Sequence, residues 1–301
     1  MTTAAPAPCR RKKFDPAQPF LIVLCTLVCF ITIYPMYYVF IMSISDPAEA
    51  ARGAVTLWPK GFYLGSYQTI FRDGKLWRAY GNTIFYAAAS TLLMLTTTVL
   101  MAYPLTRPNL KFRKAVVFFL LIPMYFGGGL IPTFLLIYKL GIYNTIWSMI
   151  LPSVSIWNII LCRTFFMSIP GEVAESATID GANHFQTLWR IYLPLSKPVL
   201  AVIAIYTIVG VWNSWFNAMV YLPNENLHPL QMYLQRILIA QTVDLKKIMT
   251  MSEMQDAVKK MLSSQQLKYT MIFFISAPIM LIYPCFQKYF IKGVMLGSLK
   301  G

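Results

Sequence analysis

Residues that could carry out chemistry are few in this sequence. Two histidines, His184 and His228, and five cysteines lack the paired spacing of a metal site, and four of the cysteines fall in apolar runs. We therefore expect neither a metal ion nor a disulfide. Three carboxylates, Glu172, Glu175 and Asp180, instead lie together in one polar segment. Carboxylates grouped in this way form strong, directional contacts with a basic partner.

Composition identifies the chain as a membrane protein. Of its 301 residues, 57% are hydrophobic and 12% are charged, against about 25% charged in soluble domains. A helix that crosses the membrane needs about 20 mostly apolar residues. We therefore expect an all-α fold with six transmembrane helices. The six stretches are 19–43, 82–103, 115–138, 143–164, 198–220 and 269–290.

Basic residues next to the spans set the expected orientation. The formal net charge is +15, but Lys and Arg lie between apolar runs rather than in one patch, so we expect no nucleic-acid partner. The segments predicted inside and those predicted outside contain equal numbers of basic residues. The predicted orientation therefore rests on the short segments 10–13 and 104–114, whose closely spaced basic residues favour a cytoplasmic location. Both termini are expected inside, with a cytoplasmic tail at 1–18 and a transmembrane domain at 19–301 whose core is 82–291.

Three connections are long enough to carry structure or function. Residues 165–197 are predicted on the cytoplasmic side, and residues 46–81 and 221–268 outside. The first outer loop is rich in aromatic residues, which favours a structured segment at the membrane surface. In the second, residues 245–267 form either an exposed amphipathic helix that meets a partner or a solvated connection.

The interiors of the spans exclude some functions. Gly127–Gly129, flanked by Pro123 and Pro132, predicts a broken or bent third span that shapes a cavity or a gate. The spans contain no Asp or Glu, which argues against a secondary transporter driven by an ion gradient. Both histidines lie in loops, which argues against an enzyme that works within the membrane. The sequence also lacks Gly-x-x-x-x-Gly-Lys-Ser/Thr, so we expect that the chain is not an enzyme and holds no nucleotide cofactor of its own.

Polar and aromatic residues in the fourth and fifth spans are candidates for a transport pathway. They are Asn158, Trp212, Asn213 and Asn217. Polar groups in spans are costly unless they face a bundle interior or a wet cavity, and amides beside aromatic rings suit a sugar. Amides also join helices to one another by hydrogen bonds, and this alternative stays open.

The polar segment at 168–194 begins with the signals of a short helix. Ser168 can cap a helix whose first turn takes Pro170, where the missing N–H costs nothing. Glu172 and Glu175 lie early enough in this helix to interact favourably with its dipole. The sequence therefore predicts a helix that starts directly after the fourth span.

The same segment then predicts a tight turn and a second helix. Gly181 follows Asp180 and can take the left-handed conformation that ends a helix. Asn183 and Gln186 have the spacing of a capping box, which opens a new helix. This second helix is expected to stop near Pro194.

These residues resemble a known motif. Glu175-Ser176-Ala177, then Gly181, then Ile191-Tyr192-Leu193-Pro194, resembles the EAA loop of permease subunits in bacterial ABC importers, with Ser176 in the place of the first Ala. Ile179-Asp180-Gly181-Ala182 and the string from Leu193 to Pro198 are similar to the sugar-importing branch, in particular to the smaller permease of maltose-type systems. The resemblance covers nearly the whole chain and implies a type I, MetI-like permease core.

The resemblance also implies a mechanism. In the family, the short helix of this loop fits a cleft on a cytoplasmic ATPase subunit, and closure of the ATPase dimer around ATP moves it. Carried over, Glu175 pairs with a basic group of the ATPase, and Gly181 permits the turn that seats the helix. Asp180 is either a second polar contact or only the end of the helix. The other residues implied in this contact are Glu172, Ser176, Ala177 and Ala182, of which the small Ser176 and Ala177 would allow close approach.

Further partners follow from the resemblance. They are a second homologous permease subunit, two cytoplasmic ATPase subunits that bind Mg-ATP, and an extracytoplasmic binding protein that docks on residues 221–268, all at the inner membrane of a bacterium and its lipid. In the family the last residues of this subunit reach between the ATPases, although a frayed tail is the alternative here. The candidates for this contact are Ser298, Leu299, Lys300 and Gly301.

The implied substrate is an oligosaccharide. The chain looks like the subgroup that imports oligosaccharides, including uronate-containing ones such as alginate or aldouronate fragments. The outer loops carry 12 basic and 7 acidic residues, a net charge of +5, which would not repel an anionic ligand. A neutral sugar or another solute is the alternative.

Overall fold

The computed structural model describes residues 17–243, 262–263, 266–282 and 284. Within these residues the regular elements are helices, beside one isolated antiparallel bridge between Ser45 and Phe62, so the all-α prediction is confirmed. The α-helices are α1 (Ala17–Ile44), α2 (Pro47–Ala51), α3 (Gly65–Arg72), α4 (Gly74–Ala102), α5 (Arg113–Tyr125), α6 (Leu130–Lys139), α7 (Trp147–Ile150), α8 (Ile156–Ser168), α9 (Gly171–Ile179), α10 (His184–Thr187), α11 (Leu193–Leu195), α12 (Lys197–Trp212), α13 (Phe216–Tyr221), α14 (Leu230–Val243) and the helix Gln266–Ile282. Short helical turns of other types lie at Pro104–Thr106, Leu151–Ser153, Leu188–Tyr192 and Glu225–Leu227.

Several of these helices have the length and the apolar composition of membrane-spanning helices. Three in the described part are long and apolar enough to cross it, namely Gln18–Ile44, Gly74–Thr106 and Trp147–Ser168. Two apolar pairs are bent, α5 with α6 by 114° and His184–Leu195 with α12 by 76°. The Gln266–Ile282 helix is apolar but shorter, and the rest of the predicted sixth span lies outside the described residues. The number of six spans and their orientation stay predictions.

The predicted bend of the third span is confirmed. α5 ends at Tyr125 and α6 begins at Leu130, with an angle of 114° between the two helices. Gly129, directly before α6, has φ 81° and ψ −178°, a backbone conformation that is essentially restricted to glycine. A side chain at this position would therefore strain the sharp change of direction.

The helix that contains the second span starts two helical turns before residue 82, the predicted start of that span. α4 begins at Gly74 rather than at residue 82, because Asp73 caps it by accepting a hydrogen bond from the backbone N–H of Lys75 at 2.8 Å. The segment 46–81, which was expected to lie outside and to be structured, contains α2, α3 and these first turns of α4.

The predicted fifth span is not one continuous helix. α12 ends at Trp212, and α13 begins only at Phe216. The side-chain amide of Asn213 donates to the carbonyl oxygen of Val209 at 3.0 Å, and such bonds compete with the helical backbone pattern. The expectation of an unbroken helix over 198–220 is therefore wrong.

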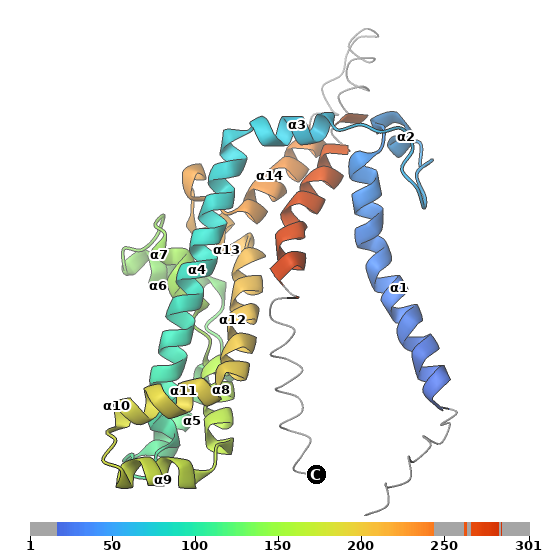
Figure 1. Cartoon of the computed structure of the whole chain (residues 1–301). Helices are drawn as coiled ribbons and strands as arrows, with labels where there is room; N and C mark the ends of the chain where they lie inside the picture. Colours follow the sequence, from blue (N-terminus) through green and yellow to red (C-terminus); the bar gives the residue numbers. More distant parts are fainter. Residues whose placement is uncertain (1–16, 244–261, 264–265, 283, 285–301) are drawn as a thin grey trace, which may run out of the picture.

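α4 is the central helix of the bundle and packs along α12 and α8 (Figure 1). α1 stands apart from the other helices over most of its length, and only its last turns are buried (Figure 1). Among the clusters of buried side chains, two lie near the ends of α4, and the two ends of the bundle are called inner and outer after the predicted orientation. The inner cluster consists of Met94, Val99, Ala102, Tyr103, Ile159, Cys162, Phe166, Ala174, Leu188, Tyr192, Val199 and Ile203. The outer cluster consists of Ile70, Leu76, Ala79, Trp212, Leu230, Leu234, Met271 and Ile275.

Gln266 attaches the Gln266–Ile282 helix to the outer end of α1. Its side chain is fully buried, and Nε2 lies 3.3 Å from the carbonyl oxygen of Ser43 and 2.6 Å from that of Ser45. The same nitrogen lies 3.2 Å from the carbonyl oxygen of Tyr63, and Oε1 accepts from the Ser66 hydroxyl at 2.8 Å. One amide thus contacts main-chain carbonyl oxygens of two segments, at the end of α1 and before α3, and a side-chain hydroxyl of α3.

We expect Gln266→Leu to lower the free energy of unfolding by about 2–4 kcal/mol, because the substitution leaves buried carbonyl oxygens without a donor. Thermal unfolding of the purified protein in detergent measures this loss. Gln231→Leu is the matched control, because Gln231 makes one hydrogen bond at a partly exposed position, to Asn213. Equal melting temperatures for the two variants would contradict the role given to Gln266.

Candidate functional site

The segment predicted as a coupling loop forms an elbow at one end of the bundle (Figure 1). It consists of α9, a tight turn and the helical stretch from α10 to α11, residues 171–195, and is called the elbow below. The elbow lies at the end of α4 opposite to α3 and α14 (Figure 1). Its position is set by the connections that precede and follow it.

A proline fixes the start of the elbow. Ile169 is extended, with φ −71° and ψ 129°, because a proline ring disfavours the helical conformation of the residue before it. α8 therefore ends at Ser168, and Pro170 is the N-cap residue of α9. The prediction that Ser168 caps α9 is wrong, since its hydroxyl donates to the carbonyl oxygen of Phe165 at 2.7 Å, within α8.

α9 ends in a left-handed turn, as predicted for Gly181. This residue has φ 79°. The N–H of Gly181 donates to the carbonyl oxygen of Thr178 at 3.1 Å, and the N–H of Ala182 donates to that of Ala177 at 2.9 Å. These are the two bonds of a Schellman motif. A Cβ at Gly181 would meet nothing within 4 Å, so the backbone conformation, and not lack of space, requires glycine.

The predicted capping box opens the second helix. The side chain of Asn183 accepts from the N–H of Gln186 at 2.8 Å, and the side chain of Gln186 accepts from the N–H of Asn183 at 2.9 Å. The helical stretch passes through a π-helical turn and ends at Leu195, one residue after Pro194. The chain then bends by 76° into α12.

α9 has a buried face and an exposed face. Ala174 and Ala177 are 7% and 8% exposed and lie three residues apart, and Ala174 belongs to the inner cluster. Glu172, Glu175 and Ser176 are exposed. The two carboxylates are therefore accessible to a partner. Ala177 is covered by its own chain, and the expected close approach of a partner at this residue stays a prediction.

The turn residues of the predicted contact are also accessible. Asp180 is the C-cap residue of α9, and its N–H donates to the carbonyl oxygen of Ser176 at 2.9 Å. Asp180 is exposed and Ala182 is partly buried. Asp180 thus ends the helix, and a contact of its carboxylate with a partner stays a prediction.

Large apolar side chains share the exposed surface of the elbow, and sequence reasoning missed them. Ile179, Phe185 and Trp189 are 86%, 68% and 63% exposed. The rings of Phe185 and Trp189 are stacked, with centroids 6.0 Å apart and an interplanar angle of 11°. Phe185 and Trp189 are four residues apart, and so are the buried Leu188 and Tyr192, on a different side of the helix. This spacing could have indicated from the sequence that Phe185 and Trp189 share an exposed face. Exposed apolar groups among polar ones mark contact surfaces.

A cation–π contact joins the elbow to the end of α4. The guanidinium carbon of Arg107 lies 4.3 Å from the ring centroid of Tyr103 and 4.7 Å from that of Tyr192. The two tyrosine rings meet edge to face at 5.2 Å, and Tyr192 meets Phe166 edge to face at 5.4 Å. Sequence reasoning missed this contact because Arg107 and Tyr192 are far apart in the chain.

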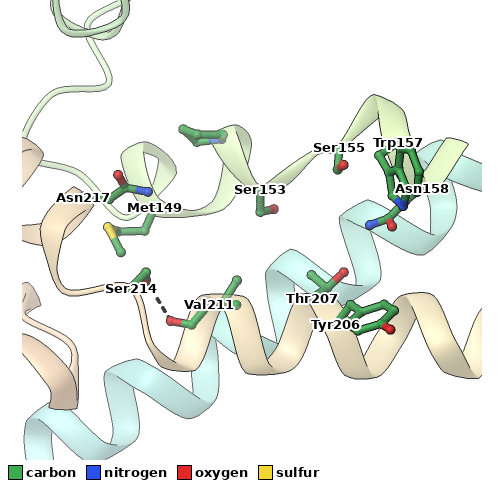
Figure 2. A pocket seen from close by; sticks show the side chains of 12 residues that line it. Met149, Ser153, Ser155, Trp157, Asn158, Tyr206, Thr207, Val211, Ser214 and Asn217 are labelled. Atoms are coloured by element: carbon green, nitrogen blue, oxygen red, sulfur yellow. Dashed lines mark hydrogen bonds between the residues drawn. The ribbon is translucent and has the colours of Figure 1, made fainter. Parts of the chain in front are cut away.

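A cavity of about 470 Å³ lies between α8, α12 and the segment that precedes α8 (Figure 2). Two of the predicted pathway residues line it, with Asn158 beside Trp157 at one end and Asn217 beside Met149 at the other (Figure 2). Hydroxyl groups and aromatic rings make up much of the remaining wall. The lining residues are Met149, Pro152, Ser153, Ser155, Trp157, Asn158, Tyr206, Thr207, Gly210, Val211, Ser214 and Asn217.

The other two pathway candidates do not line this cavity. Trp212 is 3% exposed in the outer cluster, and its Nε1 donates to the carbonyl oxygen of Ile275 at 3.2 Å. Asn213 donates to Val209 and accepts from the side-chain amide of Gln231 at 3.2 Å. Asn213 thus joins α12 to α14, which is the alternative that the sequence left open.

A group of charged residues lies at the outer end of α4. The carboxylate of Glu225 lies 2.7 Å from Nη1 of Arg236 and 3.8 Å from Nζ of Lys75. The hydrogen bond from Arg236, followed by the charges of Arg236 and Lys75, lowers the pKa of Glu225. Burial lowers the pKa of His228, whose Nε2 lies 2.7 Å from the carbonyl oxygen of Leu222. At neutral pH this surface therefore carries an ionised carboxylate held by two cations.

Some predicted features lie outside the described residues. They include almost all of the tail 1–18 and most of the segment 245–267. The predicted contact residues Ser298, Leu299, Lys300 and Gly301 also lie outside them.

The sequence profile of one family matches residues 9–296. This family is described as the binding-protein-dependent transport system inner membrane component. The chain belongs to this family. It is therefore a transport component and not itself an enzyme, and it is a multi-pass permease of the bacterial inner membrane that works with a substrate-binding protein.

Two relatives are similar to the permease over nearly its whole length. Protein LplC of Bacillus subtilis (strain 168) is 38% identical over 272 residues, which cover 90% of each chain. The polygalacturonan/rhamnogalacturonan transport system permease protein YtcP of the same organism is 32% identical over 298 residues, covering 97% of this permease and 100% of that protein.

A solved structure agrees with these relatives. It is the crystal structure of a bacterial ABC transporter involved in the import of the acidic polysaccharide alginate. One chain in it is 32% identical to the permease, with a TM-score of 0.81 and coverage of 93% of this chain and 99% of that chain. The permease thus has the MetI-like fold and is a permease of a sugar or oligosaccharide ABC importer.

We expect Gly181→Val to weaken the turn at the end of α9, because a left-handed conformation costs about 1–2 kcal/mol for a residue with a side chain. Hydrogen–deuterium exchange of the amides at 181 and 182 should become about tenfold faster. Gly181→Asn should change exchange much less, since Asn tolerates this conformation. Gly81→Ala, in the interior of α4, is the control and should leave exchange in the elbow unchanged. Similar exchange in the Val and Asn variants would contradict the backbone explanation.

Proposed function

We propose that the elbow couples this permease to a separate ATPase subunit. The supporting observation is the division of α9 into two faces. Ala174 and Ala177 hold the helix against the bundle, while Glu172 and Glu175 face outward. A carboxylate on a rigidly held helix can pair with a basic group of the ATPase in only one geometry. Glu175 is the central member of this contact, as the EAA-like motif implies.

Apolar side chains complete the docking surface. Ile179, Phe185 and Trp189 add exposed apolar area to the polar surface of the elbow. When a partner covers such groups, water leaves the neighbouring ion pair, and the attraction between the two charges increases. Ser176 and the turn at Asp180 to Ala182 lie within the same surface.

Contacts of the elbow with the neighbouring helices can transmit its movement to the membrane spans. Tyr192 belongs to the elbow, and its contacts with Tyr103, Arg107 and Phe166 lie in or beside the inner cluster. α12 follows the elbow after one residue and contributes Tyr206, Thr207, Gly210 and Val211 to the cavity wall. Because a close-packed contact transmits displacement, a shift of α9 would alter the cavity. Arg107 and Tyr192 act here as positioning residues.

The complete importer in this proposal has four kinds of subunit, of which this permease is one. A second, homologous permease supplies the other half of the pathway, and two ATPase subunits bind and hydrolyse Mg-ATP. The binding protein docks on the outer loops, above all on residues 221–268. Residues 298–301 form an additional contact with the ATPases. Closure of the ATPases around ATP moves the elbow, and the cavity opens outward to receive its substrate.

The proposed substrate is an oligosaccharide that contains uronic acids. Support comes from the alginate transporter and from the polygalacturonan permease, since both polymers consist of uronic acids. Amides and hydroxyls in the cavity can bind hydroxyl and carboxylate oxygens, and Trp157 and Tyr206 offer aromatic faces to sugar rings. Asn158 and Asn217 are the amides placed to make such contacts.

We expect Glu175→Lys to reduce substrate-stimulated ATP hydrolysis at least about tenfold, because the substitution sets two like charges against each other at a contact that excludes water. The measurement uses the full importer in proteoliposomes, with binding protein and alginate oligosaccharides. In a parallel measurement, maltooligosaccharides replace the alginate oligosaccharides, and they should not stimulate ATP hydrolysis by the wild-type importer.

Lys139→Glu is the matched control, because it changes the charge by the same magnitude, with the opposite sign, at an exposed position at the end of α6. This variant should retain wild-type stimulation. Full stimulation in Glu175→Lys would contradict the coupling role of the elbow. Stimulation by maltooligosaccharides alone would contradict the proposed substrate and leave the coupling role standing.

A further inference from the structure

A second cavity, of about 310 Å³, lies between the start of α5 and the inner half of α8. It is separate from the cavity that contains Asn158 and from the exposed face of α9. Among the described residues, its wall contains three cations, three apolar side chains and no acid. These residues are Arg113, Lys114, Val117, Phe118, Leu121 and Arg163.

The main chain fixes two of the three cations. Nη1 of Arg113 lies 3.5 Å from the carbonyl oxygen of Thr106, and Nε of Arg163 donates to that of Leu105 at 3.2 Å. A guanidinium group has five N–H donors, so each arginine retains donors for a ligand. In the described part of the chain, the ion pairs all lie at the outer end of the bundle. Among the described residues, the three cations at this cavity therefore have no acidic side chain as an ion-pair partner.

The first turn of α5 adds to this positive potential. Arg113 and Lys114 are the first two residues of the helix, at the positive end of its dipole. The N-cap residue, Phe112, is left-handed with φ 59° and makes no side-chain cap hydrogen bond. Cations and uncapped N–H groups in one place are unfavourable, and an anion between them would offset both costs.

An apolar wall continues from the cations along α5. Val117, Phe118 and Leu121 follow Lys114 at three, four and seven residues, on one side of the helix, and Phe118 is 68% exposed. α5 belongs to the third apolar span and starts at the end of the bundle that carries the elbow (Figure 1). The cavity thus leads from a charged membrane surface toward the hydrocarbon region.

We propose that this cavity binds an anionic phospholipid of the membrane leaflet on the elbow side. The phosphodiester lies between Arg113, Lys114 and Arg163, and an acyl chain lies along Val117 and Leu121. Basic pockets at the cytoplasmic ends of spans bind anionic headgroups in this way. A free phosphate ion would meet the cations but leave the apolar wall uncovered. A zwitterionic lipid would bind less well, because the positive group of its headgroup would lie near the three cations of the cavity.

The test measures lipid retention by the full-length permease in its assembled importer. The complex is exchanged into mixed micelles with phosphatidylglycerol or phosphatidylcholine of the same acyl chains, and native mass spectrometry counts retained lipid. Phosphatidylglycerol should be retained at least about tenfold better than phosphatidylcholine. Lys114→Gln, at an exposed position where folding is not at risk, should reduce this preference about fivefold. Lys139→Gln at the other end of the third span should leave it unchanged.

Several results would overturn the proposal. Equal retention of the two lipids would exclude an anionic site, as would identical behaviour of Lys114→Gln and Lys139→Gln. Displacement of phosphatidylglycerol by an equal concentration of inorganic phosphate would show a simple anion site. A preference that exists in the isolated full-length permease and vanishes in the assembled importer would show that a neighbouring subunit, and not a lipid, covers the cavity.

Discussion

The contact between Arg107 and the rings of Tyr103 and Tyr192 is the interaction on which the structure of the permease depends. It joins the end of the central helix α4 to the elbow at a place where the Nε and Nη2 atoms of Arg107 are buried and, among the described residues, have no hydrogen-bond partner. A guanidinium in such surroundings is stabilised mainly by the faces of the aromatic rings, which hold it in one orientation. The elbow is therefore fixed to the bundle by packing, although it is rich in polar residues.

α12 extends this fixed contact to the cavity. Ser196, which separates α11 from α12, is fully buried, so the bend of 76° lies inside the packed region rather than in a free loop. α12 then packs along α4, and its outer half faces α8 across the cavity (Figure 2). A helix that touches both the elbow and the cavity wall can move both only together, because close-packed interfaces shift between discrete arrangements rather than deform continuously.

Features that depend on local backbone conformation could be predicted from the sequence. The left-handed turn at Gly181, the capping box at Asn183 and the sharp bend at Gly129 each follow from a residue type and its immediate neighbours. The wrong prediction that Ser168 caps α9 also concerns local backbone conformation. The effect of Pro170 on the conformation of Ile169 outweighed the preference of serine for the N-cap position.

Features that depend on tertiary contacts could not be predicted. No pattern in the sequence distinguishes Asn158 and Asn217, which share a cavity, from Trp212 and Asn213. The partners of these two residues, Ile275 and Gln231, come from later helices. The same holds for Arg107, whose ring partners lie on two different elements. Sequence periodicity shows that a residue is apolar or polar, but not which of its neighbours in space will satisfy it.

Cross-linking from the exposed face of α9 tests the central claim most directly. A single cysteine is introduced as Ser176→Cys into a permease without its native cysteines, and a short bifunctional thiol reagent is applied to inverted membrane vesicles that contain the ATPase with a cysteine in its docking cleft. The proposed coupling predicts one cross-linked product between permease and ATPase, whose yield changes when ATP is bound. A cysteine at 176 that reacts only with impermeant reagents outside the cell, or that never cross-links to the ATPase, would contradict it.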